Sequence, residues 1–61
     1  MSIKDKREAL GISQKELAEL LSVTPGAVCQ WETGRTLPRG KRLRLLSLIL
    51  RCTEEDLLRE A

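Results

Sequence analysis

The sequence contains no histidine, tyrosine or phenylalanine, only one tryptophan and only two cysteines. A general-base histidine is therefore excluded, and so is a zinc site, because zinc binds mainly through histidine and cysteine. The scarcity of aromatic rings disfavours RNA binding, since RNA-binding domains stack bases on such rings. No nucleophile, base or metal cluster is evident, so we expect neither an enzyme nor a bound cofactor or small-molecule ligand.

Long hydrophobic runs are also missing. No apolar stretch approaches the roughly 18 residues of a membrane helix, and residues 1–10 lack the hydrophobic region of a signal peptide. Cys29 and Cys52 could form one disulfide, but in a chain without export signals two reduced thiols are the more common state. We therefore expect a cytoplasmic protein with no membrane partner.

The length of 61 residues predicts one domain, spanning residues 1–61. A domain this small buries a marginal core, so a partner subunit would help to stabilise it. Charge is unevenly distributed: residues 33–53 carry six basic side chains and no acid, although the whole chain has a net charge of only +2. This basic segment is either a solvated surface or an electrostatic footprint for an anionic polymer.

Start and stop signals predict five short helices, and nothing alternates with the period of a strand, so the fold class is all-α. Ser2 and Ser13 begin the first two helices, and the first ends at Leu10, before a glycine. Thr24 caps the third, with Pro25 at its first position. The apolar stripe of the second helix is formed by Leu17, Leu20 and Leu21.

The last two helices follow a turn that contains Gly34 and Pro38. The longer one is predicted to run from Arg39 to Arg51, although Gly40 favours a start one turn later. Thr53 caps the final helix, whose first turn is acidic and so interacts favourably with the helix dipole.

Helical spacing places Val28 and Trp31 on the same face of the third helix, and we expect that face to be buried. The opposite face is small and uncharged and consists of Gly26, Cys29, Gln30 and Thr33. A small face at a helix N-terminus allows close contact, and its free amides favour an anion. Two helices joined by a tight turn, the second presenting such a face, form a helix-turn-helix.

Residues 10–57 resemble the Cro/repressor type of helix-turn-helix domain, the XRE-like family. The matching residues agree with the family pattern without gaps, and they include a Gln at the start of the second helix and a Trp-Glu pair in the third. They are Gln14, Leu17, Ala18, Ser22, Val28, Trp31, Glu32, Gly34, Pro38, Leu43, Leu46, Leu50, Cys52 and Leu57.

The resemblance implies a compact five-helix, lambda-repressor-like domain that regulates transcription by binding double-stranded DNA as a dimer, with residues 25–32 in the major groove. Gln14 would bind a phosphate, and Gln30 could pair with adenine. The remaining implied DNA contacts are Thr24, Pro25, Gly26, Ala27, Cys29 and Thr33 from the third helix and Arg35, Arg39, Lys41 and Arg42 beyond it. The resemblance also implies an internal ion pair between Arg7 and Glu32.

The start of the third helix departs from the family pattern, because Pro25, Gly26 and Ala27 have no hydrogen-bonding side chain. Direct reading of bases is therefore expected to be limited, and specificity to depend partly on DNA shape.

A second departure concerns the fourth helix, which carries apolar residues where relatives have polar ones. These residues lie off the stripe that the family buries, and exposed apolar patches commonly mark an interface. We therefore expect a homodimer interface formed by Leu37, Leu45, Leu48, Ile49 and Leu58.

The rival hypothesis is a protein-interaction module, such as an antitoxin, that uses the same fold. That function would require an exposed apolar groove and would leave the basic segment unexplained. The position of the basic segment beside the third helix favours DNA binding.

Overall fold

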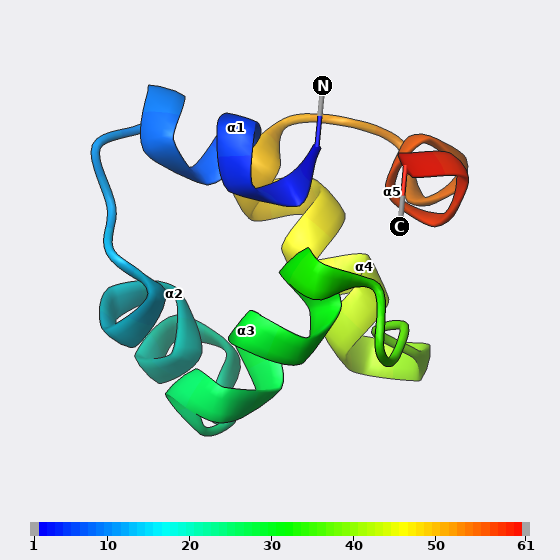
Figure 1. Cartoon of the computed structure of the whole chain (residues 1–61). Helices are drawn as coiled ribbons and strands as arrows, with labels where there is room; N and C mark the ends of the chain where they lie inside the picture. Colours follow the sequence, from blue (N-terminus) through cyan, green and yellow to red (C-terminus); the bar gives the residue numbers. More distant parts are fainter. Residues whose placement is uncertain (1, 61) are drawn as a thin grey trace.

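The computed structural model describes residues 2–60 and folds them into five α-helices, as the sequence predicts, with no strand among these residues. The helices are α1 (Ile3–Ala9), α2 (Gln14–Leu21), α3 (Pro25–Thr33), α4 (Gly40–Leu50) and α5 (Glu54–Glu60). Figure 1 shows α3 in the centre, with α2 to its left, α1 above, and α5 at the right next to α4. Helix α3 packs mainly on α2 and also on α1, whereas α4 packs on α1, α2 and α5.

Local hydrogen bonds begin the helices where the sequence predicts. In α2 the Ser13 hydroxyl accepts from the Glu16 amide at 3.0 Å, while the Glu16 carboxylate accepts from the Ser13 amide at 2.9 Å. These bonds stabilise the ionised carboxylate, and the Ser13 amide is the main reason that the pKa of Glu16 is lowered. The same reciprocal bonds begin α1 at Ser2 and α5 at Thr53. These starts therefore depend on residues only three positions apart.

Helix α4 is one residue shorter at each end than predicted, and it does not begin a turn late. It starts at Gly40, whose φ of +58° lies in the left-handed region that glycine adopts without strain. Gly40 therefore turns the chain into the helix and does not delay it. Arg51 ends the helix with the same left-handed φ of +58°.

Ten apolar residues form one core, to which all five helices contribute. They are Ile3, Leu17, Ala18, Leu21, Val28, Trp31, Leu43, Leu46, Leu50 and Leu57. Leu20 was predicted in this stripe, but it is 58% exposed because Ala18, and not Leu20, completes the buried arc of α2. Cys52 is only half-buried, at the edge of the core. No helix in residues 2–60 is long and apolar enough to span a bilayer.

Candidate nucleic-acid interface

Helices α2 and α3 are joined by a tight turn over residues 22–24. Ser22 ends α2 in the left-handed region, with a φ of +58°. The Val23 amide then donates to the Ala18 carbonyl at 2.9 Å, and the Thr24 hydroxyl accepts from the Ala27 amide at 3.2 Å. These bonds fix the angle at which α3 leaves the turn, and the pair forms the helix-turn-helix that the sequence predicts.

The two faces of α3 are divided as helical spacing predicts. Val28 and Trp31 are buried, whereas the residues of the opposite face are exposed. That exposed face consists of Gly26, Cys29, Gln30 and Thr33. Ala27, which the resemblance assigns to DNA contact, is half-buried and packs against the core. Only part of its methyl group is therefore available to a partner.

Two residues of this face have local features that the sequence did not reveal. The Thr33 hydroxyl donates to the Cys29 carbonyl at 3.0 Å and to the Gln30 carbonyl at 3.2 Å, so its proton is used within the helix. At Gly26 an added Cβ would meet only the Thr24 hydroxyl oxygen, at an ordinary 3.8 Å. The fold thus tolerates alanine at position 26, although glycine costs a helix about 0.5–1 kcal/mol.

A buried ion pair joins α1 to α3, as the resemblance implies. Arg7 Nε donates to Glu32 Oε2 at 2.7 Å, and the two side chains are only 9% and 5% exposed. Arg7 also donates through Nη1 to the Ile12 carbonyl at 2.9 Å. The hydrogen bond to Glu32 is the main cause that raises the pKa of Arg7, so the guanidinium stays charged in its buried position.

Gln14 belongs to the same hydrogen-bond network as Arg7 and Glu32, and the sequence did not predict this contact. Its Nε2 donates to Glu32 Oε1 at 3.0 Å, and the side chain is half-buried. The sequence places these residues at the start of α2 and the end of α3, and no spacing rule connects them. One carboxylate therefore ties together α1, α2 and α3.

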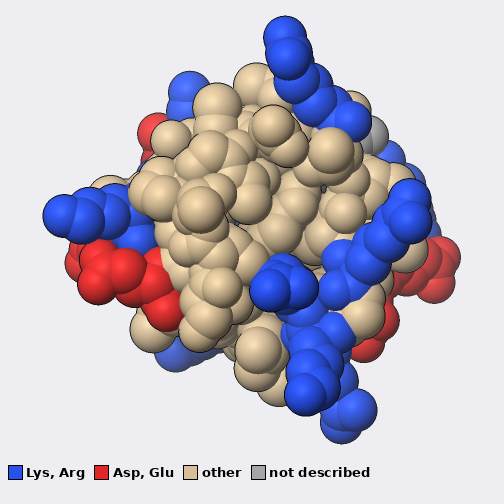
Figure 2. Space-filling view, turned by 90° about the horizontal axis from the view of Figure 1, so that it is seen from below, with Lys and Arg blue, Asp and Glu red and all other residues tan. Residues whose placement is uncertain are grey.

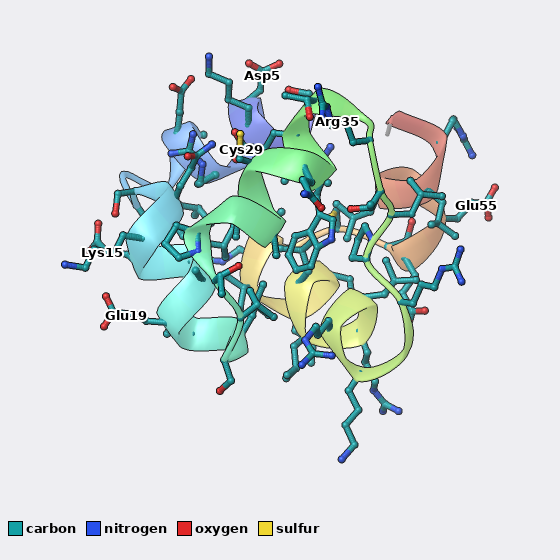
Figure 3. The ribbon with its side chains drawn as sticks, turned by 60° about the horizontal axis from the view of Figure 1, so that its bottom comes forward. Asp5, Lys15, Glu19, Cys29, Arg35 and Glu55 are labelled. Atoms are coloured by element: carbon teal, nitrogen blue, oxygen red, sulfur yellow. The ribbon has the colours of Figure 1, made fainter. Side chains whose placement is uncertain are left out.

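The basic residues predicted to contact an anionic partner are all exposed. They are Arg35, Arg39, Lys41 and Arg42. The N-terminus of α4 lies among them in the sequence; Arg39 makes no side-chain cap and the first turn carries no acid, so no carboxylate competes with an anion there. In Figure 2, Lys and Arg side chains gather along one side of a broad uncharged surface. Figure 3 shows Arg35 on the same side of the molecule as Cys29 of α3.

Comparison with known proteins places this geometry in a family. A family model described as helix-turn-helix matches residues 3–57. The chain belongs to the helix-turn-helix family. Its fold matches the solution structure of the DNA-binding domain of the P22 C2 repressor with a TM-score of 0.80 and 38% identity, over 92% of this chain and 74% of that one.

Two relatives of this helix-turn-helix chain are regulators by name. It is 37% identical over 57 residues to the repressor protein C2 of Salmonella phage P22. It is 39% identical over 51 residues to the HTH-type transcriptional regulator DicA of Escherichia coli. The matches cover 93% and 84% of this chain but only 26% and 38% of the relatives' lengths.

The positions of the two thiols predict different reactivities. We expect a thiol reagent to modify exposed Cys29 at least about tenfold faster than half-buried Cys52, because Cys52 needs local opening for full access. Mass spectrometry of partly labelled native protein measures both rates, with Cys29→Ser and Cys52→Ser assigning them. Equal labelling rates of Cys29 and Cys52 in the native protein would contradict the assignment of Cys29 to the exposed face of α3.

Proposed function

We propose that this helix-turn-helix domain binds double-stranded DNA sequence-specifically, with α3 in the major groove, and regulates transcription. The observation that carries this proposal is the small exposed face of α3 beside a cluster of exposed basic residues at the turn and the start of α4. The likeness to a solved DNA-binding domain and to a named repressor supports it.

Contacts to bases would come from the exposed face of α3. Gln30 is exposed, and its amide can donate to and accept from adenine in the major groove. Gly26 has no side chain, and only the Thr24 hydroxyl lies near the position of an added Cβ, so DNA could approach the backbone closely there. Thr24, Pro25, Cys29 and Thr33 would lie at the edge of this contact, and Ala27 would contribute little.

Contacts to phosphates would supply most of the affinity. Four exposed basic residues and the uncapped amides of α4 provide the positive potential that a DNA backbone attracts. Gln14, at the N-terminus of α2, would add a hydrogen bond from an uncharged side chain to a phosphate.

The first test of this proposal is the dependence of DNA affinity on salt. Arg42→Gln should weaken binding to all duplexes alike and reduce the slope of log K against log[salt] by about 0.9, the value for one phosphate contact. The matched control is Arg59→Gln, which removes an equally charged, exposed residue from α5. If both variants keep the wild-type slope, the basic segment is a solvated surface.

The second test concerns base recognition by Gln30. Gln30→Ala should lose about 1–3 kcal/mol of discrimination at one base pair, with non-specific affinity nearly unchanged. Selection of duplexes from random DNA by both proteins measures this difference. Equal weakening on selected and random duplexes would rule out base reading by Gln30.

The alternative function, a protein-interaction module or antitoxin, is favoured by one observation. Ile12 and Leu20 line a shallow hollow on α2 together with Glu16 and Glu19. Two of its four lining residues are acidic, and a partner bound there would leave the exposed basic residues unexplained, so DNA binding remains the better account. Binding tests with random duplexes distinguish the two, because only the DNA-binding function predicts an affinity for duplex DNA that falls as the salt concentration rises.

We further propose that the domain acts as a homodimer. Leu37, Leu45 and Leu58 are 42%, 43% and 44% exposed, and Leu48 is 67% exposed, a large apolar area for a small domain. Ile49 is half-buried against the core, because it lies three residues from buried Leu46, so we leave it out of this interface. A two-fold symmetric dimer would place the α3 helices of its two subunits about 34 Å apart, which is one turn of DNA.

We propose a non-enzymatic regulator that works in the cytoplasm. A reducing compartment is proposed because two reduced thiols are the more common state in a chain without export signals.

A further inference from the structure

The Arg7–Glu32–Gln14 network links the buried ion pair to a residue at the surface. Glu32 Oε1 accepts hydrogen bonds from Gln14 Nε2 at 3.0 Å and from Arg7 Nη2 at 3.4 Å, while Oε2 accepts from Arg7 Nε at 2.7 Å. Glu32 is 5% exposed, whereas Gln14 is half-buried at the first position of α2. The buried Arg7 side chain therefore holds the Glu32 carboxylate, and the half-buried Gln14 amide bonds to the same carboxylate.

The chemistry of these groups determines the orientation of the Gln14 amide. An ionised carboxylate only accepts hydrogen bonds, so it selects the NH₂ end of the amide and excludes the oxygen end. Nε2 has a second hydrogen that does not point along the bond to Glu32. A phosphate also only accepts, so this second N–H is the group through which Gln14 would bind it.

Arg7 makes this arrangement compatible with a polyanion. A buried carboxylate without a partner would repel an approaching phosphate, but the guanidinium at 2.7 Å compensates its charge. The same guanidinium donates to the Ile12 carbonyl at 2.9 Å and so holds the chain just before α2. Charge compensation and the position of α2 thus depend on one side chain.

We propose that Glu32 is a positioning residue for DNA binding: through its hydrogen bond to Nε2 it holds the Gln14 amide with one N–H directed outward, as a preformed phosphate donor. This inference rests on the proposed function and deepens it. It assigns the Arg7–Glu32 pair a role in DNA affinity in addition to its role in stability.

The test requires a variant that removes the carboxylate and keeps the fold. Arg7→Met combined with Glu32→Leu replaces both buried charges by apolar side chains of similar volume, an exchange that is often neutral for stability. It also leaves the net charge of the protein unchanged, so electrostatic attraction to DNA is preserved. Circular dichroism and thermal unfolding verify the fold.

The first measurement needs no DNA. The side-chain ¹⁵N order parameter of Gln14 should exceed about 0.6 in the wild type and fall below about 0.6 in the double variant. Exposed Gln30 is the internal control and should be mobile in both proteins. A Gln14 amide as mobile as that of Gln30 in the wild type, or equally ordered without Glu32, overturns the proposal.

The second measurement is a mutant cycle that compares the wild type, Gln14→Ala, the double variant and the triple variant. The quantity measured is the affinity of each protein for a duplex that the wild type selects from random DNA. Gln14→Ala should weaken wild-type binding about tenfold, as expected for one hydrogen bond to a charged group. The double variant should lose a similar factor, and adding Gln14→Ala to it should cost nothing further. The salt slope should stay at the wild-type value throughout, because no cationic contact is lost.

The outcomes separate this inference from the proposed function. If Gln14→Ala weakens binding by the same factor in the wild type and in the double variant, Glu32 does not act through Gln14. That result overturns the positioning role, while DNA binding stands. A wild type that selects no duplex overturns the proposed function and any role in DNA affinity. The order-parameter measurement still decides, in that case, whether Glu32 holds the amide.

Discussion

Glu32→Ala is expected to lower the free energy of unfolding by about 3 kcal/mol, at the lower end of the range for breaking a buried ion pair. The substitution leaves Arg7, whose side chain is only 9% exposed, without its carboxylate partner, and Gln14 loses its acceptor. Small domains are stable by only about 5–15 kcal/mol, so this is a large fraction of the total. Urea unfolding followed by circular dichroism measures the difference.

The control for this experiment is an exposed ion pair, between Glu55 and Arg59 in α5. It has nearly the same length, 2.8 Å, but its side chains are 79% and 68% exposed. Glu55→Ala should therefore change the stability little, because solvent screens an exposed pair. Similar effects of Glu32→Ala and Glu55→Ala would show that burial does not set the strength of the α1–α3 pair.

Leu48→Lys is expected to convert the proposed dimer to a monomer and to weaken binding to a two-half-site operator about 100-fold or more. Leu48 is the most exposed large apolar residue of α4, so a charge there should disrupt an interface without disturbing the core. The loss in affinity follows because a monomer cannot bind both half-sites as one linked unit. Sedimentation gives the oligomeric state, and titration of operator and half-site duplexes gives both affinities.

A matched substitution exists on α2, where Leu20 is 58% exposed and lies outside the proposed interface. Leu20→Lys should leave the dimer intact. A wild type that sediments as a monomer at high micromolar concentration would be evidence against the dimer. Unfolding of Leu48→Lys would instead indicate that Leu48 contributes to the core.

The starts of α1, α2, α3 and α5 could be predicted from the sequence because they depend on contacts between near neighbours. The Ser13–Glu16 and Thr53–Asp56 boxes close within three residues, and Pro25 follows its cap directly. The buried face of α3 also follows from local spacing alone. Each of these features depends only on the residues of one helix and its N-cap.

The resemblance to repressor domains added the Arg7–Glu32 pair, which joins residues 25 positions apart. No local pattern contains it, because the pair exists only where α1 and α3 meet. The attachment of Gln14 to Glu32 was not foreseen, since it depends on how α2 lies against the end of α3.

The sequence by itself determined five helices, the N-terminal caps of α1, α2, α3 and α5, the inner face of α3 and the concentration of positive charge in residues 33–53. Only the tertiary structure decided which residues at the edges of the apolar stripes are covered. Leu20 is exposed, whereas Ile49 and Cys52 are half-buried against the core. Periodicity gives the direction of a side chain relative to its own helix axis, but burial depends on whether another helix lies in that direction.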